Sequence, residues 1–313
     1  MAATPVLEVG GTHVTAALVA ADGSGVHRRV RLPLDPHGSA TRIIGTLVGC
    51  ARLIPAPARA VWGVAVPGPF DYERGVGRFA GVGKFDALNG VDLRAALLGR
   101  LPQRPRDAVF LNDADAFLYG EWRAGAARGH GRCAGLTLGT GVGSAFLADG
   151  RIRDEGPGVP PEGRADLLRI DGRPLEESVS RRAIRDRYGD PDADVHDIAA
   201  RARAGDARAR RVLDEAFTGL GAVLAPFLAE FGASVLVVGG AMAHSWDLVR
   251  PALGSGLGTV RVELRRSALG ADAALVGAAG RARPTEPEAS GDLGHSGRSG
   301  GSGRAGRSGV TSP

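Results

Sequence analysis

Two glycine-rich turns and one pair of polar residues are the parts of this sequence best suited to chemistry. The turns are Gly10-Gly11-Thr12 and Gly139-Thr140-Gly141-Val142-Gly143, and the polar pair is Asn112-Asp113. Glycine allows backbone N–H groups to approach phosphate oxygens closely. Each turn alone is also what a tight hairpin requires. Together, one in each half of the chain, they could hold a polyphosphate from two sides, which favours phosphoryl transfer.

Asn112-Asp113 lies between an apolar stretch, Ala108 to Leu111, and the helical pattern DADAFLYGEWRAGAA. Asn and Asp are favoured caps for a helix that begins at this point. Side chains at the carboxyl end of a strand also point toward the crevice where α/β sheets bind ligands, and a carboxylate there can accept a hydroxyl proton. Capping and proton transfer both remain open for this pair.

Three glutamates are further candidates. Glu8 interrupts an apolar strand just before the first glycine turn, where magnesium bound to a phosphate would need an oxygen ligand or an acceptor for its water. An outward-facing strand residue is the alternative for Glu8. Without further information, Glu162 and Glu176 are expected to be surface charges, as single carboxylates in exposed segments usually are.

Strands and glycine turns alternate in a way that suggests two similar halves. Apolar runs separated by the two turns predict hairpins, and further runs end in Pro or Gly. The predicted strands are Val6 to Val9, Val14 to Ala20, Ala60 to Val66, Ala108 to Leu111, Ala134 to Leu138, Ser144 to Leu147, Val235 to Val238 and TVRVEL at 259–264.

Helical spacing predicts the elements that cover these strands. Helices are expected from Val91, from Asp113 and from Leu175. Further helices are expected from His196 to Phe231 with breaks near Gly205 and Pro226, over SWDLVRPAL at 245–253 and over ADAALVGAAGRA at 271–282. The segment Asp154 to Gly172, rich in Gly, Pro and charge, is expected to be irregular. The tail 284–313 is low-complexity Gly/Ser/Arg sequence and is expected to be disordered without an assigned role.

Composition excludes several classes of protein. The chain has 313 residues, of which 43% are hydrophobic, and its formal charge of +5 is spread over both signs, so nucleic acid is not an expected partner. Cys50 and Cys133 form no CxxC pair, and the histidines form no metal-ligand pattern. Without a signal peptide or a recognisable membrane span, we expect no membrane association and a cytoplasmic location.

A set of segments in fixed order resembles the ROK (repressor, ORF, kinase) family of the actin-like ATPase superfamily, from about Val6 to Ala282. The segments are LEVGGTHVTAAL, VPGPFD, FLNDADAFLYGEW, LTLGTGVGSAFLADGRI, PLEESVSRRAI and VLVVGGAM. The resemblance implies an α/β, two-domain actin-like ATPase (ribonuclease H-like) fold with an interdomain cleft. We expect the domains at 1–118 and 119–269, with the final helix, 270–283, packing back on the first.

The resemblance also implies an activity, transfer of the ATP γ-phosphate to the 6-hydroxyl of a hexose or amino-hexose such as glucose, glucosamine or kanosamine. Asp113 would be the catalytic base. The sugar contacts would be Gly68, Asn112, Asp113, Glu162 and Glu176. The ATP contacts would be Gly10, Gly11, Thr12, Gly139, Thr140, Gly141, Gly143, Gly239 and Gly240, with Glu8 serving Mg²⁺ through water. Dimers are common in the family, so a homodimer is expected.

Three departures from the family pattern concern the metal and sugar ends of the site. Glu8 stands where the family has Asp. Of the ExGH sugar motif only Glu162 aligns, with Arg164 and Ala165 in place of Gly and His. The zinc module CxCGxxGC is absent before Leu175-Glu176, so no zinc is expected.

Two other functions remain open. The first is a noncatalytic sugar-sensing or regulatory protein, although ROK repressors carry an N-terminal helix-turn-helix and this sequence starts at the phosphate hairpin. The second is an actin-like ATPase that acts on a nonsugar substrate.

Overall fold

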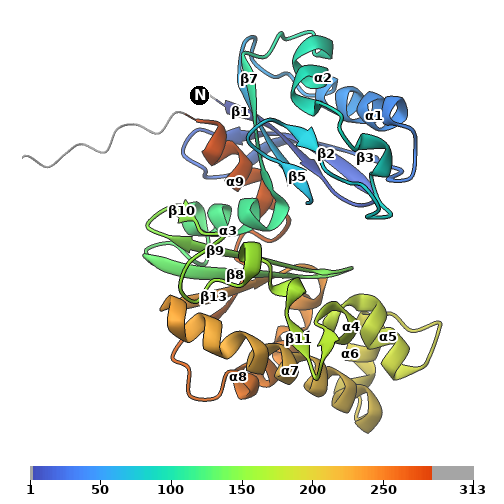
Figure 1. The fold of residues 1–313 in the computed structure, drawn as a ribbon, viewed down its shortest axis with the longest axis vertical. Coiled ribbons are helices and arrows are strands. Elements are labelled where there is room, and N and C mark those ends of the chain that lie inside the picture. The colour runs from blue at the N-terminus through green and yellow to red at the C-terminus, as the bar shows by residue number, and fades with distance from the viewer. Residues whose placement is uncertain (1–2, 284–313) are drawn as a thin grey trace, which may run out of the picture. The chain divides into compact units, whose positions relative to one another are not determined.

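Two five-stranded sheets with the same strand arrangement form the framework of the protein. The structure is a computed structural model that describes residues 3–283, and the predicted disordered tail lies outside these residues. Figure 1 shows the order of the elements. All described residues belong to one compact unit, so the predicted division into domains 1–118 and 119–269 stays a prediction.

The first sheet begins with the N-terminal hairpin and has the order β3-β2-β1-β4-β7. Neighbours are antiparallel among the first three strands and parallel from β1 onward. Its strands are β1 (Ala3–Val9), β2 (His13–Ala20), β3 (Val26–Pro33), β4 (Val61–Val66) and β7 (Asp107–Asn112).

The second sheet repeats this pattern in the order β10-β9-β8-β13-β14. The pairs β8/β9 and β9/β10 are antiparallel, and β13 is parallel to both β8 and β14. Its strands are β8 (Arg132–Leu138), β9 (Val142–Ala148), β10 (Arg151–Ile152), β13 (Val235–Gly239) and β14 (Glu263–Arg266). The predicted similarity of the two halves is therefore visible in the topology.

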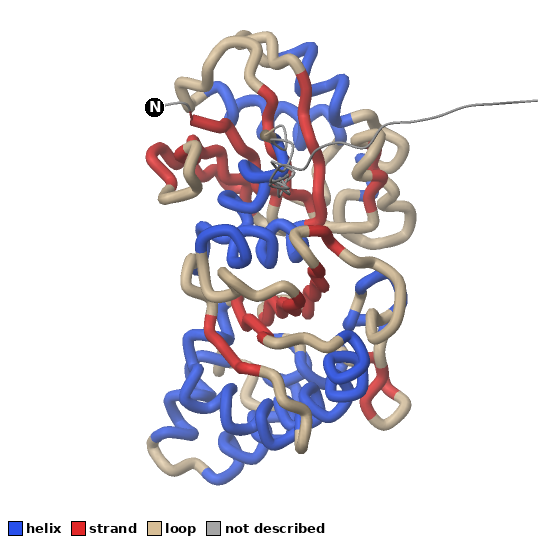
Figure 2. The backbone as a smooth tube through the Cα atoms, turned by 90° about the vertical axis from the view of Figure 1, so that its left-hand side faces the viewer, coloured by secondary structure: helices blue, strands red, loops and turns tan. Residues whose placement is uncertain are grey.

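Nine α-helices cover these sheets within the described residues: α1 (Ala40–Arg52), α2 (Leu93–Arg100), α3 (Asp113–Ala124), α4 (Glu176–Val179), α5 (Arg181–Tyr188), α6 (Val195–Arg203), α7 (Ala207–Phe231), α8 (Trp246–Leu257) and α9 (Ala273–Ala282). Two-residue strands form small ladders beside them: β5 (Phe70–Asp71) with β6 (Val76–Gly77), and β11 (Arg169–Ile170) with β12 (Arg173–Pro174). Figure 2 shows the same helices and strands along the backbone, with helices in blue and strands in red.

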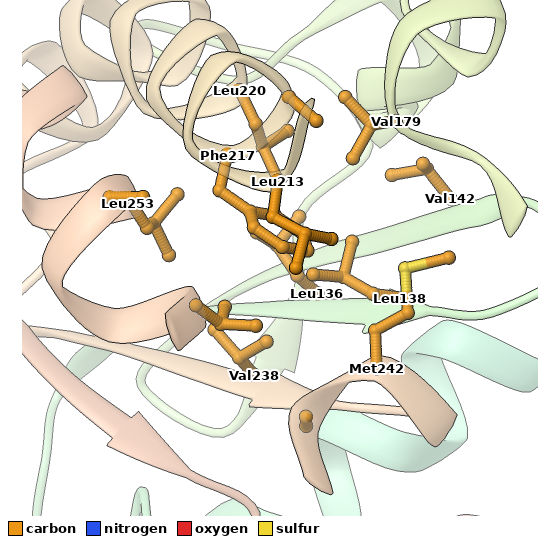
Figure 3. Packing of buried hydrophobic residues seen from close by; sticks show 14 of the residues in the cluster. Leu136, Leu138, Val142, Val179, Leu213, Phe217, Leu220, Val238, Met242 and Leu253 are labelled. Atoms are coloured by element: carbon orange, nitrogen blue, oxygen red, sulfur yellow. The ribbon is translucent and has the colours of Figure 1, made fainter. Parts of the chain in front are cut away.

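Each sheet has its own apolar core. Residues of β1, β2, β4 and β7 pack against α1 and α2. One face of the second sheet packs against α4 to α8, where Leu136, Leu213 and Phe217 are buried together (Figure 3). The burial of these side chains, at ~1.5–3 kcal/mol each, holds the helices on the sheets.

The helices α3 and α9 connect the two cores. Phe117 and Leu118 of α3 pack on β8, β9 and β13 of the second sheet. Val276 and Ala279 of α9 pack against Val6 and Ala65 of the first sheet. A β-carbon on Gly277 would lie 1.8 Å from the Ala116 carbonyl oxygen, so the two helices cross at near-backbone contact. The C-terminal helix thus returns to the first sheet while α3 lies on the second.

Most predicted elements are confirmed, with three corrections. The break expected near Pro226 is wrong, because α7 runs through it. Proline removes the hydrogen-bond donor for the carbonyl of residue 222, and Ala222 is exposed, so water can satisfy that carbonyl. The strand expected at 259–264 is shifted. Pairing with β13 places the strand at Glu263–Arg266, and Val260 and Val262 pack on the core from the loop before it.

The third correction concerns α7 again. This helix is long and apolar enough to cross a membrane by length and composition, contrary to the expectation that no segment is. One face of the helix, which includes Leu213, Phe217 and Leu224, is buried in the core of the second sheet. This packing is typical of a core helix.

Candidate active site

The first glycine turn connects β1 to β2 as a tight hairpin. Val9 pairs with Val14, and the Gly10 amide donates to the His13 carbonyl at 2.8 Å. A β-carbon on Gly10 would lie 3.0 Å from His13 Cε1, which leaves little room for a side chain. A side chain at Gly10 would therefore require His13 to shift.

The second glycine turn connects β8 to β9 in the equivalent position. The Gly139 amide donates to the Gly141 carbonyl at 3.0 Å. A β-carbon on Gly143 would lie 2.4 Å from Thr137 Oγ1 and 3.2 Å from the β-carbon of Ala114. This turn is thus packed against the first turn of α3.

Asn112 immediately precedes α3 and Asp113 is its first residue, and their side chains make different hydrogen bonds. Asn112 is the cap: its Oδ1 accepts hydrogen bonds from the amides of Ala114 at 2.8 Å and Asp115 at 3.4 Å. Within residues 3–283, the carboxylate of Asp113 accepts one hydrogen bond, from the amide of Ala114 to Oδ1 at 3.0 Å. Because Asn112 satisfies the helix N-terminus, the carboxylate of Asp113 retains an oxygen for another partner.

Asp113 lies near the strand that leads into the first glycine turn. Burial among protein atoms is the main cause that raises its pKa, and hydrogen bonds from backbone amides oppose the shift. The residue nevertheless has a solvent-exposed side. A group can have both properties when it faces an opening walled by protein, and a raised pKa makes the carboxylate a better proton acceptor.

Glu8 shares this environment. Burial raises its pKa to about 7, the charge of Asp113 adds to the shift, and Arg31 and Arg29 oppose it. The first turn of α3 therefore lies beside both glycine turns: Asp113 is electrostatically coupled to Glu8 of β1, and Ala114 packs on Gly143. Asp115, which the sequence reading passed over, has a pKa raised to about 7 by burial and by Asp113 and Asp154.

Glu8→Gln is expected to stabilise the protein at neutral and alkaline pH. Glu8 has an ordinary pKa of 4.5 and a folded pKa of about 7, so the folded state keeps a proton that the unfolded state releases between these values. The contribution of Glu8 to the free energy of unfolding therefore falls as pH rises through this window. Relative to wild type, the melting temperature of Glu8→Gln should rise by on the order of 5 °C at pH 8 and be unchanged at pH 4. Equal melting temperatures at pH 8 would contradict this environment for Glu8.

Asn112 also bonds to Tyr72, the residue that follows β5. Its Nδ2 donates to the Tyr72 hydroxyl at 3.0 Å, and that hydroxyl donates to the Val66 carbonyl at 3.3 Å. A β-carbon on Gly68 would lie 3.2 Å from the Tyr72 hydroxyl and 3.7 Å from Asn112 Nδ2. Gly68 and Asn112, both predicted sugar contacts, are thus brought together by Tyr72, which the sequence reading did not identify.

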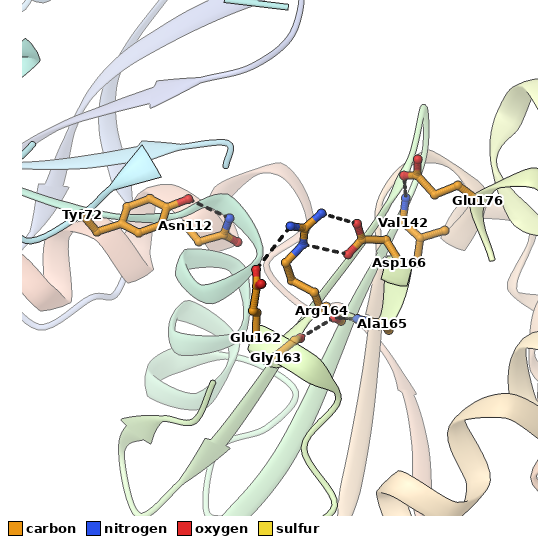
Figure 4. A network of polar contacts seen from close by, with 10 residues as sticks. Tyr72, Asn112, Val142, Glu162, Gly163, Arg164, Ala165, Asp166 and Glu176 are labelled. Carbon is orange, nitrogen blue, oxygen red and sulfur yellow. Dashed lines mark hydrogen bonds and ion pairs between the residues drawn. The ribbon is translucent and has the colours of Figure 1, made fainter. Parts of the chain in front are cut away.

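The altered ExGH segment presents a charged cluster near this group. Arg164 binds Asp166 with Nη2 at 2.7 Å and Glu162 with Nη1 at 3.5 Å (Figure 4). The positive charge of Arg164 is one of the influences on the pKa of Tyr72, which burial raises. The buried Ser144 hydroxyl donates to the Gly163 carbonyl at 2.7 Å and accepts the Ala165 amide at 2.8 Å. Ser144, the last residue of LGTGVGS, thereby ties this segment to β9.

Glu176 lies at the second glycine turn. Its Oε1 accepts the Val142 amide at 2.9 Å, and a β-carbon on Gly141 would lie 2.3 Å from the same oxygen. In this arrangement Glu176 orders the turn predicted to bind phosphate, and its predicted contact with a sugar stays a prediction.

A pocket of about 230 Å³ adjoins the second glycine turn. Gly240 has a φ of 82°, and a β-carbon there would lie 2.3 Å from the Leu138 carbonyl oxygen, so the turn after β13 packs against the end of β8. The pocket is lined by Gly139, Thr140, Arg181, Asp194, Val195, His196, Ala241, Met242, His244 and Ser245. Gly139 and Thr140, both predicted ATP contacts, therefore line the cavity. Gly239 and Gly240 directly precede Ala241 in the sequence, and Ala241 also lines the cavity.

The residues near Glu8 fit a magnesium–nucleotide complex. Among residues 3–283, no group of three or more His, Cys, Asp or Glu side chains is placed to hold a metal ion by itself. Magnesium in nucleotide enzymes typically takes most of its ligands from phosphates and water and one or two from carboxylates. Burial raises the pKa of both Glu8 and Asp113, and a cation beside the two carboxylates would favour their charged forms.

Comparisons with known proteins agree with this arrangement. The model of the ROK family matches residues 5–283. The chain is 28% identical over 272 residues to a glucokinase of Thermotoga maritima, covering 78% of this chain and 83% of that protein. It is 30% identical over 179 residues to a bifunctional enzyme NanE/NanK of Brucella melitensis, covering 54% of this chain and 34% of that protein.

The structure is similar to that of a ROK hexokinase from Thermus thermophilus, with a TM-score of 0.70 and 25% identity over 89% of this chain and 97% of the other. The predicted actin-like α/β fold is thereby confirmed. The family match spans both glycine turns, the start of α3 and the helix that returns to the first sheet. The chain belongs to the ROK family.

Proposed function

We propose that this protein is an ATP-dependent sugar kinase that phosphorylates the 6-hydroxyl of a hexose or amino-hexose. The observation that carries the proposal is the position of α3. Its first turn contacts the second glycine turn through Ala114. It also follows β7, whose Leu111 pairs with Ala65 of β4, the residue that pairs with Glu8 just before the first glycine turn. Relatives named as a glucokinase and a hexokinase support the same reaction class.

In the proposed mechanism, backbone amides of the two glycine turns hold the triphosphate, and the pocket beside Gly139 receives the nucleoside. Glu8 would hold bound Mg²⁺ through a water ligand, and the ion would offset the phosphate charge during transfer. Asp113 accepts the proton of the attacking hydroxyl, and its raised pKa favours this role. Asn112, held by Tyr72, orients neighbouring hydroxyls.

The sugar end supports an amino-hexose as well as a neutral hexose. The single cation Arg164 is paired with two carboxylates, Glu162 and Asp166, so the cluster carries net negative charge. Asp113 adds a further carboxylate nearby, since it and Arg164 both act on the pKa of Tyr72. An ammonium group on the sugar would be attracted to such a site.

The experiment that tests the function is coupled ADP release with glucose, mannose, glucosamine and kanosamine, each compared with its 6-deoxy analogue. A 6-kinase releases ADP with at least one parent sugar and not with the matching 6-deoxy sugar. Release with both members of a pair would move the reaction to another hydroxyl. Release that no sugar stimulates would favour an ATPase with a different substrate.

A noncatalytic, sugar-sensing role is the second candidate, because Ala165 stands where the family pattern has histidine. A sensor binds a sugar, raises the melting temperature and shows no turnover. Thermal shift and ADP release with the same sugar panel therefore separate the two functions. Cytoplasmic location and a homodimer stay predictions.

A further inference from the structure

One basic residue of this chain differs in chemistry from all the others. Lys84 is the only lysine among 39 basic residues, and the rest are arginine. Lysine carries a compact ammonium point charge on a flexible stem, whereas arginine presents a planar fork. A site that requires a point charge within a crowded backbone turn would be poorly served by arginine.

Lys84 lies against the first glycine turn. Its ammonium nitrogen is 3.7 Å from the position that a β-carbon on Gly11 would occupy. The residue is exposed, and within residues 3–283 its ammonium group has no carboxylate or hydrogen-bond acceptor in contact. A glycine methylene offers no counter-charge, so the ammonium group remains available to an anion at the turn.

The backbone around Lys84 is anchored on both sides. Phe79 and Phe85 are buried with ring centroids 5.5 Å apart, so the exposed loop 80–84 begins and ends on fixed aromatic residues. The Phe85 amide donates to the Pro36 carbonyl at 2.8 Å. Phe85 has a left-handed φ of 61°, an unfavourable conformation that the surrounding contacts maintain. The loop therefore presents Lys84 to the turn from a defined position.

We propose that Lys84 binds the phosphate chain of the donor nucleotide at the Gly10–Thr12 turn and neutralises part of its charge. The inference rests on the proposed kinase function and adds a phosphate-binding residue from the loop 80–84, which lies outside the two predicted phosphate turns. Backbone amides donate directional hydrogen bonds to phosphate oxygens, and the ammonium group adds a charge-assisted hydrogen bond. The alternative is that the Lys84 ammonium group binds an anionic substituent on the sugar, and the kinetic test distinguishes the two.

The kinetic test compares Lys84→Met with Lys84→Arg. Loss of a charge-assisted phosphate contact should lower kcat/KM for MgATP by about 10- to 100-fold in Lys84→Met. Lys84→Arg keeps the charge and should recover part of the loss. The KM for the sugar should stay within about twofold in both variants, because the contact is with the donor. A rise in sugar KM with unchanged kcat/KM for MgATP would overturn the proposal.

Arg106→Met is the matched control. Arg106 is exposed and precedes the amino end of β7, whose carboxyl end holds Asn112. The Arg106→Met substitution removes one positive charge at the end of the first sheet away from the site. Its kcat/KM for MgATP should equal that of wild type. A loss comparable to that of Lys84→Met would show that the loss in Lys84→Met comes from net charge and not from a phosphate contact.

Amine acetylation gives a test that needs no turnover. Lys84 carries the only side-chain amine, so acetylation followed by mass spectrometry reports on this residue, with the α-amino group as internal standard. MgATP or tripolyphosphate should slow acetylation of Lys84 at least about fivefold and leave the internal standard unchanged. If Lys84 is protected in a protein that phosphorylates no sugar, the kinase function is contradicted and the phosphate site at Lys84 is supported. If Lys84 is not protected in a protein that does phosphorylate a sugar, the site at Lys84 is contradicted and the kinase function is supported.

Discussion

Asp113→Asn is expected to lower kcat for sugar-dependent ADP release by about 10²- to 10⁴-fold. Asparagine has the shape of aspartate but cannot accept the hydroxyl proton. The cap of α3 is retained because Asn112 makes it. Burial raises the pKa of Asp113, so removing its charge should leave the melting temperature unchanged or raised, and the loss of activity cannot then be attributed to unfolding.

Asp115→Asn is the matched control for this prediction. Asp115 is in the same turn of α3, also has a raised pKa, and loses the same charge on substitution. It lies two residues further around the helix, where Arg281 of α9 is one of the charges that act on it. Its kcat should stay within about threefold of wild type. Equal losses in the two variants would assign the effect to the local field, and full activity in Asp113→Asn would remove Asp113 as the base.

Gly277→Ala is expected to lower the free energy of unfolding by about 3 kcal/mol and the melting temperature by about 5–10 °C. A β-carbon at Gly277 would lie 1.8 Å from the Ala116 carbonyl oxygen and 3.0 Å from the Gly120 amide nitrogen. These are backbone atoms of α3, so the clash is relieved only if the helices move apart. Because α3 carries Asp113, the variant should also lose activity at temperatures where it remains folded.

Gly45→Ala provides the opposite expectation for the same substitution. Gly45 is an exposed position inside α1, and a β-carbon there meets no atom within 4 Å. Alanine should stabilise this helix by about 0.5–1 kcal/mol through its better helix propensity. Thermal or urea unfolding of both variants checks the pair. A stabilised Gly277→Ala would contradict the close crossing of α3 and α9.

The parts of the site that could be predicted from sequence are those with a local cause. Gly10 and Gly141 lie in the expected turns, since an apolar run, a glycine cluster and a second apolar run specify a hairpin from neighbouring residues. The cap at Asn112 is likewise local: the choice between Asn112 and Asp113 was open, but the helix start was not.

Contacts between distant segments could not be predicted in this way. Neither the hydrogen bond of Tyr72 to Asn112 nor the support of the Gly163 segment by Ser144 leaves a periodic signal. The strand β3 was missed because its polar side chains, such as Arg29 and Arg31, belong to an edge strand with an exposed face. Lys84 could have been noticed as the only lysine, yet its place at Gly11 depends on the loop anchored by Phe79 and Phe85.

A crystal structure with a non-hydrolysable ATP analogue, Mg²⁺ and the sugar selected in the ADP-release panel would measure the central geometry directly. With Asp113 as the base, its carboxylate should lie within about 2.6–3.2 Å of the sugar hydroxyl that faces the γ-phosphate. The triphosphate should lie between the Gly10–Thr12 and Gly139–Gly143 turns. A sugar with no hydroxyl near Asp113, or a triphosphate bound at neither turn, would contradict the assignment.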